Sequence, residues 1–537
     1  MTGIWTRTRW LAAMLVVSLG ALLIALGPTV PSLAQSPECG AAGGTIVAAM
    51  STNPPTLDPM LSTTTASRQV AVYLFESLIT YDENYAIIPQ LAASWTSTSN
   101  GLVYIFKLRP GVKFHNGQTL TAADVKASFE RYLKVAPGAL QRFSGFKSVT
   151  AVDALTVRFE LTTRFSFLPN LAIPSPLFAV LPKAIIDKYG EKEIRGQDLV
   201  GTGPYKFAEW RPDVAVRLTK FADYRPDARF AGATGFGGRR VACADQIGLI
   251  PVVEAGSRVA GLLTGAYDFA ESVPITSVPQ LEASKTITVE IVKPKWGIFD
   301  ELNHGEPPMD KLAFRKALVA SLDMGQVLSA TSFGNRPEYI RVSPSIFFPE
   351  QKDWYTTAGS GMYNKPDLAQ AKRLLTEAGY NNEPIILLTN QNYDWMYKAS
   401  LAQAAQWQRA GINIKIELMD WPSQIQRAQS LKGWHINQTG WSPRLDPLQT
   451  AVSLKCGSLS AYNYCNREMD QLLDQVNTDL PLKQRQAVWT KIQQLVWDDV
   501  SVIRIGDYFE PEAIGSSLKG YRPFYVIPRF WNVTKER

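Results

Sequence analysis

The feature that most restricts the fold is an alternation of strand-like and helix-like segments in the second half of the chain. We expect helices at Ser257–Leu263, Lys311–Leu322, Asp367–Ala378 and Ser400–Ala410, and strands at Gln246–Pro251, Ile385–Leu388 and Ile412–Leu418. Gly379 and Gly411 end two of the helices, as glycine commonly does. Strands that alternate with helices form sheets covered by helices, so the sequence predicts an α/β fold.

The first half of the chain is richer in strands. Strands are expected at Gly44–Met50, Leu102–Leu108, Thr156–Leu161 and Tyr205–Glu209. Thr121 and Asp124 are spaced as a capping box at the start of a helix that ends near Lys134. Near the C-terminus we expect helices at Met469–Val476 and Leu482–Trp497 and a last strand at Val502–Ile505.

The chain is long enough for more than one core. It has 537 residues, of which 46% are hydrophobic and 19% charged, and single cores rarely grow to this size. The formal net charge is +7, but Lys and Arg do not gather in runs. This even distribution argues against a nucleic-acid partner.

The N-terminus has the features of an export signal. Arg7 and Arg9 precede an apolar run from Leu11 to Leu26, and Ser32-Leu33-Ala34 offers small residues for a signal peptidase. We therefore expect residues 1–34 to be a signal peptide that is cleaved after Ala34, and the mature protein to be periplasmic. The alternative is an uncleaved anchor, for which the apolar run is shorter than the roughly 20 residues that span a bilayer.

Export places all four cysteines in an oxidising compartment, where an even number favours disulfides. Cys456 and Cys465 bracket a short loop-like stretch, so we expect them to pair. Cys39 and Cys243 then pair by elimination, an assignment that the sequence alone leaves open.

Motifs for catalysis are scarce. The three histidines, His115, His304 and His435, are not spaced as metal ligands, and no nucleophile elbow, phosphate-binding loop or dinucleotide fingerprint follows a strand. We therefore expect no catalytic residue, no metal and no cofactor. A hydrolase that uses two carboxylates stays open, because such a pair needs only spatial proximity.

Several long motifs carry a family resemblance. Leu108-Arg109-Pro110-Gly111-Val112-Lys113-Phe114-His115-Asn116-Gly117 closely resembles the signature of the family 5 extracellular solute-binding proteins, the dipeptide, oligopeptide and nickel binding group. Thr56-Leu57-Asp58-Pro59, Gly201-Thr202-Gly203-Pro204-Tyr205 and Gly440-Trp441 before Asp446-Pro447 extend the likeness over most of the chain.

The resemblance implies a two-lobed fold of the periplasmic binding protein type, class II-like, with three domains and a hinge between the lobes. Domain I would comprise residues 35–71, 200–293 and 500–537, domain II would be inserted at 72–199, and domain III would cover 294–499. The hinge would consist of two crossing segments.

The resemblance also implies a ligand site between the lobes. The candidate ligand-binding residues are Thr56, Trp296, Asn390, Gln391, Tyr393, Trp421, Trp441 and Arg444. Apolar walls with few fixed polar groups suit a pocket that accepts variable side chains. The turn of Lys113, His115 and Asn116 within the signature is expected to be structural, because a turn before a capped helix needs such residues regardless of ligand.

Arg444 departs from the family pattern. Dipeptide and oligopeptide binders carry an Asp between the Trp and the Asp-Pro pair, where it holds the peptide's α-amino group, and they use an Arg in the loop that matches Asn390-Gln391-Asn392. Arg444 either contacts an anionic group of the ligand or braces its loop by pairing with Asp446 or another acid.

The resemblance implies a monomeric, non-catalytic receptor that captures a peptide or peptide-like solute and delivers it to the permease of an ABC transporter. A sugar- or opine-type receptor of the same family is the alternative. Nickel or haem capture has no supporting histidine cluster.

Overall fold

The structure is a computed structural model that describes residue 39 and residues 43–98, 100–174, 177–332, 336–478 and 480–536. The described residues belong to one compact unit, residues 38–537. The expected signal peptide, residues 1–34, lies outside the described residues.

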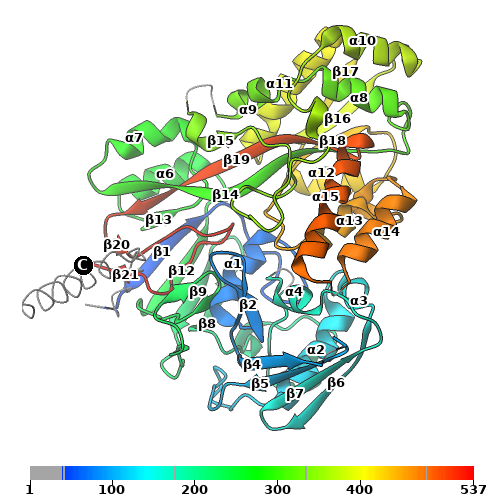
Figure 1. Ribbon diagram of the computed structural model, residues 1–537. Coiled ribbons are helices and arrows are strands. Elements are labelled where there is room, and N and C mark those ends of the chain that lie inside the picture. The colour runs from blue at the N-terminus through cyan, green and yellow to red at the C-terminus, as the bar shows by residue number, and fades with distance from the viewer. Residues whose placement is uncertain are drawn as a thin grey trace, which may run out of the picture. The chain divides into compact units, whose positions relative to one another are not determined.

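Five sheets contain the described strands (Figure 1). Their bounds are β1 Thr45–Met50, β2 Ile79–Tyr81, β3 Ile87–Pro89, β4 Ala92–Ser97, β5 Val103–Leu108, β6 Phe146–Asp153, β7 Thr156–Leu161, β8 Tyr205–Arg211, β9 Ala215–Lys220, β10 Ala233–Thr234, β11 Gly237–Gly238, β12 Gln246–Pro251, β13 Phe269–Ala270, β14 Ile287–Leu302, β15 Ile340–Arg341, β16 Ile385–Asn390, β17 Ile414–Met419, β18 Ile436–Trp441, β19 Val502–Gly515, β20 Leu518–Lys519 and β21 Thr534–Lys535.

Fifteen α-helices accompany them in the described part of the chain. They are α1 Thr65–Leu74, α2 Ala122–Val135, α3 Ala139–Arg142, α4 Phe167–Ala172, α5 Lys183–Tyr189, α6 Ala255–Leu263, α7 Val278–Glu282, α8 Leu312–Ala320, α9 Met324–Thr331, α10 Leu368–Glu377, α11 Asp394–Ala410, α12 Trp421–Gln429, α13 Ala451–Leu454, α14 Arg467–Val476 and α15 Leu482–Asp498. The predicted capping box is present at α2, where the backbone N–H of Thr121 donates to Asp124 Oδ2 at 2.9 Å.

The largest sheet has the order β17-β16-β18-β14-β19-β13-β1-β12-β9-β8, with β15 added to β19. At one end, β16 runs parallel to both β17 and β18. Towards the other end, β1 runs parallel to both β12 and β13. Two groups of parallel strands therefore share one sheet, joined by the antiparallel pair of β14 and β19.

That pair is long and interrupted. Residues 287–292 of β14 pair with the C-terminal half of β19, and residues 296–302 pair with its N-terminal half and with β18. The register shifts between Val292 and Trp296. Pro294 lies in the interruption and has no N–H to donate to the ladder. The two strands thus connect the two parallel groups through an irregular segment.

A separate four-stranded sheet has the order β4-β5-β7-β6 and is covered by α2. In Figure 1 its cyan and blue strands lie apart from the large sheet. This sheet falls within the expected inserted domain, residues 72–199. The expected border at residue 72 lies inside α1, so the helix continues across it.

The predicted elements are mostly present, and two expectations are wrong. The final strand was expected to end at Ile505, but β19 continues to Gly515 and is followed by β20 and β21. Helix α11 begins at Asp394, not at Ser400. The buried acids of β19, Glu510 and Glu512, interrupt the apolar pattern from which strands are predicted.

Both expected disulfides are present, Cys39–Cys243 and Cys456–Cys465. The first ties the start of the described chain to the segment before β12. The second closes the loop between α13 and α14.

Candidate functional site

The candidate site lies where the two groups of parallel strands present their carboxyl ends. Ligands of open α/β sheets bind outside such ends. In one group, β16 ends at Asn390, β17 is followed by Trp421 and β18 ends at Trp441. In the other, Ser51 follows β1 and Glu271 follows β13.

A buried hydrogen-bond network positions the first group. Glu301 of β14 accepts from the indole N–H of Trp441 at 2.8 Å and from Asn437 Nδ2 at 2.9 Å. Gln424 of α12 donates to Asn437 Oδ1 and accepts from Asn390 Nδ2, both at 2.7 Å. Asn390 is fully buried, and its amide braces the ends of β16 and β18.

Aromatic rings follow the ends of β16 and β17. The Tyr393 and Trp421 rings meet edge to face, with centroids 5.5 Å apart. The backbone N–H of Trp421 donates to Asn392 Oδ1 at 2.9 Å, which links the two loops. The Gln391 side chain between them is exposed.

Thr56 is occupied by intramolecular contacts. Its hydroxyl donates to Glu193 Oε1 at 2.5 Å and accepts from the backbone N–H of Asp58 at 3.1 Å. Its carbonyl accepts from the Ser67 hydroxyl. Thr56 therefore ties the loop after β1 to helix α1 and to the segment that carries Glu193.

Trp296 joins two cores. It packs against the apolar cluster that includes Phe269 and Tyr525 and also against the cluster that includes Trp395 and Tyr508. Its indole N–H is buried and has no hydrogen-bond partner among the described residues. Trp296 thus places a free donor at the interrupted segment of β14.

Beside Trp296 lies an acidic cluster. Lys295 Nζ is 3.6 Å from Glu510 Oε2 and 3.8 Å from Glu512 Oε1, and all three side chains are buried. Burial raises the pKa of Glu512 to about 7, although the Lys295 ammonium opposes the shift. Burial also raises the pKa of Tyr393, and Glu510 and Glu271 add to this shift. Glu510 and Glu271 therefore lie within electrostatic reach of Tyr393, which follows β16 in the other group of parallel strands.

Arg444 lies in the loop that follows β18. Its guanidinium lies over the Trp441 ring, 4.8 Å from the centroid, and the Trp441 ring stacks on Phe299. Asp446 is not its partner, because both oxygens of that carboxylate accept from Arg485, at 2.6 and 2.8 Å. The expected alternative, an Arg444–Asp446 pair, is therefore absent.

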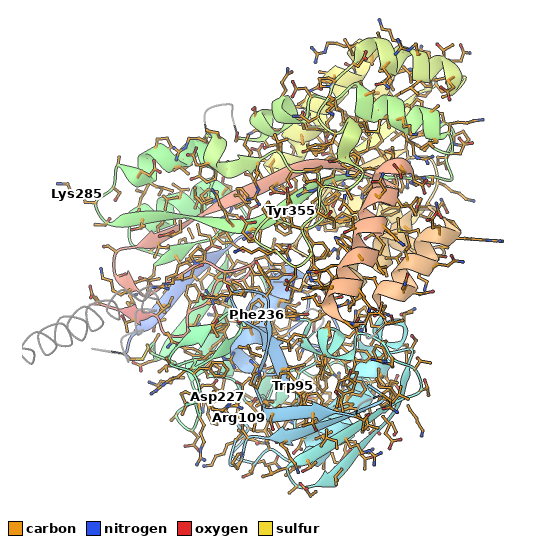
Figure 2. The ribbon with its side chains drawn as sticks, viewed as in Figure 1. Trp95, Arg109, Asp227, Phe236, Lys285 and Tyr355 are labelled. Atoms are coloured by element: carbon orange, nitrogen blue, oxygen red, sulfur yellow. A yellow bond between two sulfur atoms is a disulfide. The ribbon has the colours of Figure 1, made fainter. Side chains whose placement is uncertain are left out.

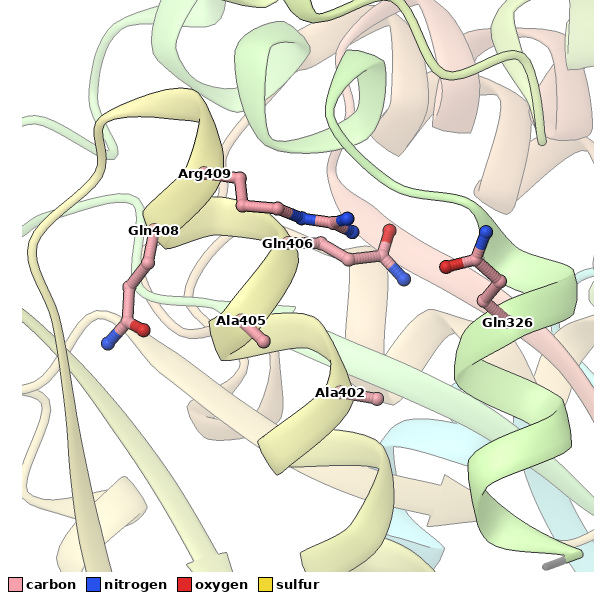
Figure 3. A pocket seen from close by; sticks show the side chains of 6 residues that line it. All are labelled: Gln326, Ala402, Ala405, Gln406, Gln408 and Arg409. Carbon is pink, nitrogen blue, oxygen red and sulfur yellow. The ribbon is translucent and has the colours of Figure 1, made fainter. Parts of the chain in front are cut away.

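A surface depression between α9 and α11 is a weaker candidate (Figure 3). Its lining consists of Gln326, Ala402, Ala405, Gln406, Gln408 and Arg409. Gln406 already accepts from the backbone N–H of Asp323, at 2.6 Å, and so joins the two helices. The depression lies along the C-terminal half of α11, away from the strand ends.

The described residues contain no group of three His, Cys, Asp or Glu side chains arranged to hold a metal ion. Within the same residues, no helix combines the length and apolar character of a membrane span.

Comparison with known proteins gives this arrangement its context. Residues 86–462 match the family described as bacterial extracellular solute-binding proteins, family 5 Middle. The glutathione-binding protein GsiB of Pectobacterium atrosepticum is 29% identical over 525 residues, which cover 94% of this chain and 96% of the relative. A probable peptide ABC transporter periplasmic-binding protein, y4tO of Sinorhizobium fredii, is 27% identical over 533 residues with the same coverages.

Solved structures share the fold. The periplasmic binding protein DppA of Helicobacter pylori in complex with the peptide STSA has a TM-score of 0.78 and 24% identity, and covers 92% of this chain and 99% of that one. The binding protein AgaA in complex with agropinic acid, from A. tumefacien R10, has a TM-score of 0.76 and 23% identity, with the same coverages.

The fold is therefore that of a two-lobed α/β binding protein. The chain belongs to the bacterial extracellular solute-binding proteins, family 5, which confirms the resemblance seen in the sequence.

Sequence reasoning missed several residues of the site. Glu301 orients Trp441 and Asn437, and Arg68 and Tyr525 face the loop that carries Arg444. A pair of acids at the end of a strand, Asp300-Glu301, was a signal that the chain itself offered. Nothing in the sequence pattern distinguishes Arg68 or Tyr525.

Proposed function

We propose that this protein is the solute-binding component of an ABC importer, and that it captures a peptide or peptide-like solute between its two lobes. The observation that supports this most is the placement of two groups of parallel strands, whose carboxyl ends carry the candidate residues, on either side of β14 and β19. Relatives named for glutathione and for peptides, alike over 94% of this chain, support the same ligand class.

The proposed architecture keeps the expected domains, 35–71 with 200–293 and 500–537, then 72–199 and 294–499. The register shift between Val292 and Trp296 supports a hinge in β14, because an interrupted ladder bends more easily than a continuous one. Binding energy would then favour the closed state, and the permease would recognise it.

The proposed site contains groups of both charges. Glu510, Glu512 and Glu271 act on the ammonium of Lys295, and the Arg258 guanidinium is also within electrostatic reach of Glu271 and Glu510, whereas Arg444 lies in the loop after β18. A ligand amine would be attracted towards the acids and a ligand carboxylate towards Arg444. This polarity supports a zwitterionic solute whose amine does not lie beside Trp441, unlike a dipeptide in the resembled relatives. Tyr393, Trp421, Trp441 and Trp296 would supply the apolar walls.

The protein is proposed to act in the periplasm, as a monomer, after removal of residues 1–34. It is proposed to release its ligand unchanged. A sugar- or opine-type receptor remains the alternative because AgaA shares the fold.

Recovery of the protein from a bacterial envelope, followed by native mass spectrometry of what it carries, tests the proposal. We expect a small peptide or a conjugate such as glutathione. The same protein, unfolded to remove its ligand and refolded with its disulfides intact, should bind glutathione or tripeptides in calorimetry and return them intact. Cleaved products would show that the protein is a hydrolase and not a receptor. Binding of sugars alone would favour the alternative receptor.

A further inference from the structure

The buried arginines of the described chain fall into clear groups. Eight arginine side chains are buried. Five contact a carboxylate: Arg131 with Asp58, Arg240 with Glu76, Arg485 with Asp446, Arg504 with Asp507 and Arg529 with Glu83. Two others, Arg258 and Arg315, donate to three or more main-chain carbonyls each. Arg68 is the remaining one and belongs to neither group.

Arg68 has only hydroxyl partners in this part of the chain. Its Nη2 donates to Thr65 Oγ1 at 2.9 Å, and its Nη1 lies 3.5 Å from the Tyr525 hydroxyl. Its Nε–H is buried without a partner among the described residues. The side chain is 7% exposed, so water does not replace the missing acceptor.

The loop that carries Arg444 reaches the same tyrosine from the other lobe. The Tyr525 hydroxyl donates to the carbonyl of Pro443 at 3.0 Å. Apart from its stacking on Trp441, the Arg444 side chain makes a 3.4 Å hydrogen bond from Nη2 to the Ser453 hydroxyl, and its buried Nε–H has no partner among the described residues. Burial lowers the pKa of Arg444, and the proximity of Arg68 lowers it further.

Tyr525 contacts Arg68 and the loop that carries Arg444. Its ring meets that of Phe236, which Figure 2 labels, edge to face at 5.8 Å. The Arg68 guanidinium lies 5.8 Å from the centre of the Tyr525 ring. Because a tyrosine hydroxyl is neutral, it supplies no negative charge to either arginine.

The nearest acid is already engaged. Glu301 is the carboxylate that acts most strongly on Arg444, but no Arg444–Glu301 ion pair forms, and both Glu301 oxygens accept from Trp441 and Asn437. Two guanidinium groups therefore share a desolvated region without a counter-charge, an arrangement that is costly unless an anion is bound.

We propose that Arg68 and Arg444, which Tyr525 connects through its contacts with Arg68 and with the Pro443 carbonyl, form a clamp for an oxyanion of the solute, which in a peptide-like solute is a carboxylate. The inference rests on the proposed function and deepens it by naming the ligand group that the two lobes hold together. One arginine comes from α1 and the other from the loop after β18, so an anion between them links the two lobes directly. Planar guanidinium groups match the two oxygens of a carboxylate.

The test uses pairs of ligands that differ in one carboxylate. The full chain is titrated by calorimetry with glutathione and with its monoethyl ester, and with tripeptides that carry a free or an amidated C-terminus. We expect the masked member of a pair to bind about 30-fold or more weakly, because a lost contact with a buried charge costs about 2 kcal/mol or more. Inorganic phosphate is added as a competitor to distinguish a general oxyanion site from one that needs the carboxylate geometry.

Variants assign the effect to residues. In Arg68→Met and Arg444→Met, the free and masked ligands should bind with nearly equal affinity. Tyr525→Phe should retain the preference, since the hydroxyl supplies no charge. Arg142→Met is the matched control, because Arg142 also lies over a tyrosine ring, that of Tyr132, without an ion pair among the described residues, but on α3. It should behave as the unaltered protein.

The outcomes are distinguishable. If no member of either series binds, the proposed function fails. If free and masked ligands bind the unaltered protein equally, or if Arg444→Met keeps the preference, the clamp is wrong while the receptor remains. If Arg68→Met does not fold, the result for Arg444→Met still decides the inference. Competition by phosphate at equal affinity would show an oxyanion site without preference for a carboxylate.

Discussion

Two arginines, Arg485 and Arg444, stack on tryptophan rings in a similar way, but only Arg485 has a carboxylate partner among the described residues. Arg485 lies 4.9 Å from the centre of the Trp354 ring, and Arg444 lies 4.8 Å from that of Trp441. Arg485 makes two hydrogen bonds to Asp446, whereas Arg444 contacts no carboxylate among the described residues. Asp446 is close to Arg444 in the sequence, but its carboxylate pairs with Arg485.

This difference separates a structural arginine, Arg485, from the proposed ligand-binding arginine, Arg444. The Asp446 carboxylate also begins the short helix of residues 447–450, where it accepts from the backbone N–H of Leu448 at 3.1 Å. The Arg485–Asp446 pair therefore fixes the loop that carries Arg444. A chain that satisfies one buried arginine and leaves its neighbour without a counter-charge holds the second one ready for a group from outside.

The largest expected effect is on stability. Arg485→Met leaves the Asp446 carboxylate buried and unpaired, and the free energy of unfolding should fall by about 3–5 kcal/mol. Arg444→Met removes a cation that has no carboxylate partner among the described residues, so the stability of the ligand-free protein should change little or rise. Chemical denaturation of both variants without ligand checks the contrast. Equal losses would mean that Arg444 is structural after all.

The next effect appears only with ligand. A solute that binds the native state alone raises the free energy of unfolding by about 2.7 kcal/mol at a hundredfold excess over its Kd. At a fixed glutathione concentration, Arg444→Met should lose most of this increment. Arg485→Met should keep it if the variant remains folded at the measuring temperature. Melting curves with and without ligand decide between the two residues.

Much of this contrast was beyond sequence reasoning. The alternation of strands and helices predicted the α/β fold, and the short spacing of Cys456 and Cys465 predicted their disulfide, because both depend on neighbours along the chain. The β14–β19 pair was not recognised, since Lys293-Pro294-Lys295 and buried acids interrupt its apolar pattern.

The partners of the site residues depend on contacts between distant segments. Arg68 meets Tyr525 across 457 positions, and Trp441 meets Glu301 across 140. The family motif located Arg444 and Trp441 but not what surrounds them. Pairing of Asp446 with Arg485, not with Arg444, is decided by the fold of the loop, and no local pattern indicates it.

A smaller effect should separate the two roles of Trp441. Trp441→Phe keeps an aromatic ring beneath Arg444 and removes the N–H that donates to Glu301. We expect a loss of stability of about 1–3 kcal/mol, because a buried acceptor loses a partner. Affinity for glutathione should change less than in Arg444→Met. Parallel denaturation and calorimetry measure both, and a larger loss of affinity than in Arg444→Met would show that the indole itself contacts ligand.

The last effect is a change in pH dependence, and it shows how a buried acid differs from a buried arginine. Asp300 is fully buried and receives a hydrogen bond from Gln403 Nε2. Burial raises the pKa of its carboxyl to about 8, and the nearby Glu301 adds to the shift. An unpaired acid can thus remain protonated and neutral near neutral pH, whereas the arginine guanidinium keeps its charge.

The sign of the effect follows from proton uptake. Between the ordinary carboxyl pKa, near 4, and about 8, the folded protein retains a proton on Asp300 that the unfolded chain has lost, so stability falls as the pH rises through this range. Asp300→Asn cannot titrate, and its free energy of unfolding should decline less steeply with pH over the same interval. Part of the decline should persist, because burial also raises the pKa of Glu301 and, to about 7, that of Glu512. Denaturation at a series of pH values measures the two slopes, and identical slopes would show that the Asp300 carboxyl is ionised in the folded protein, with Gln403 as its only compensation.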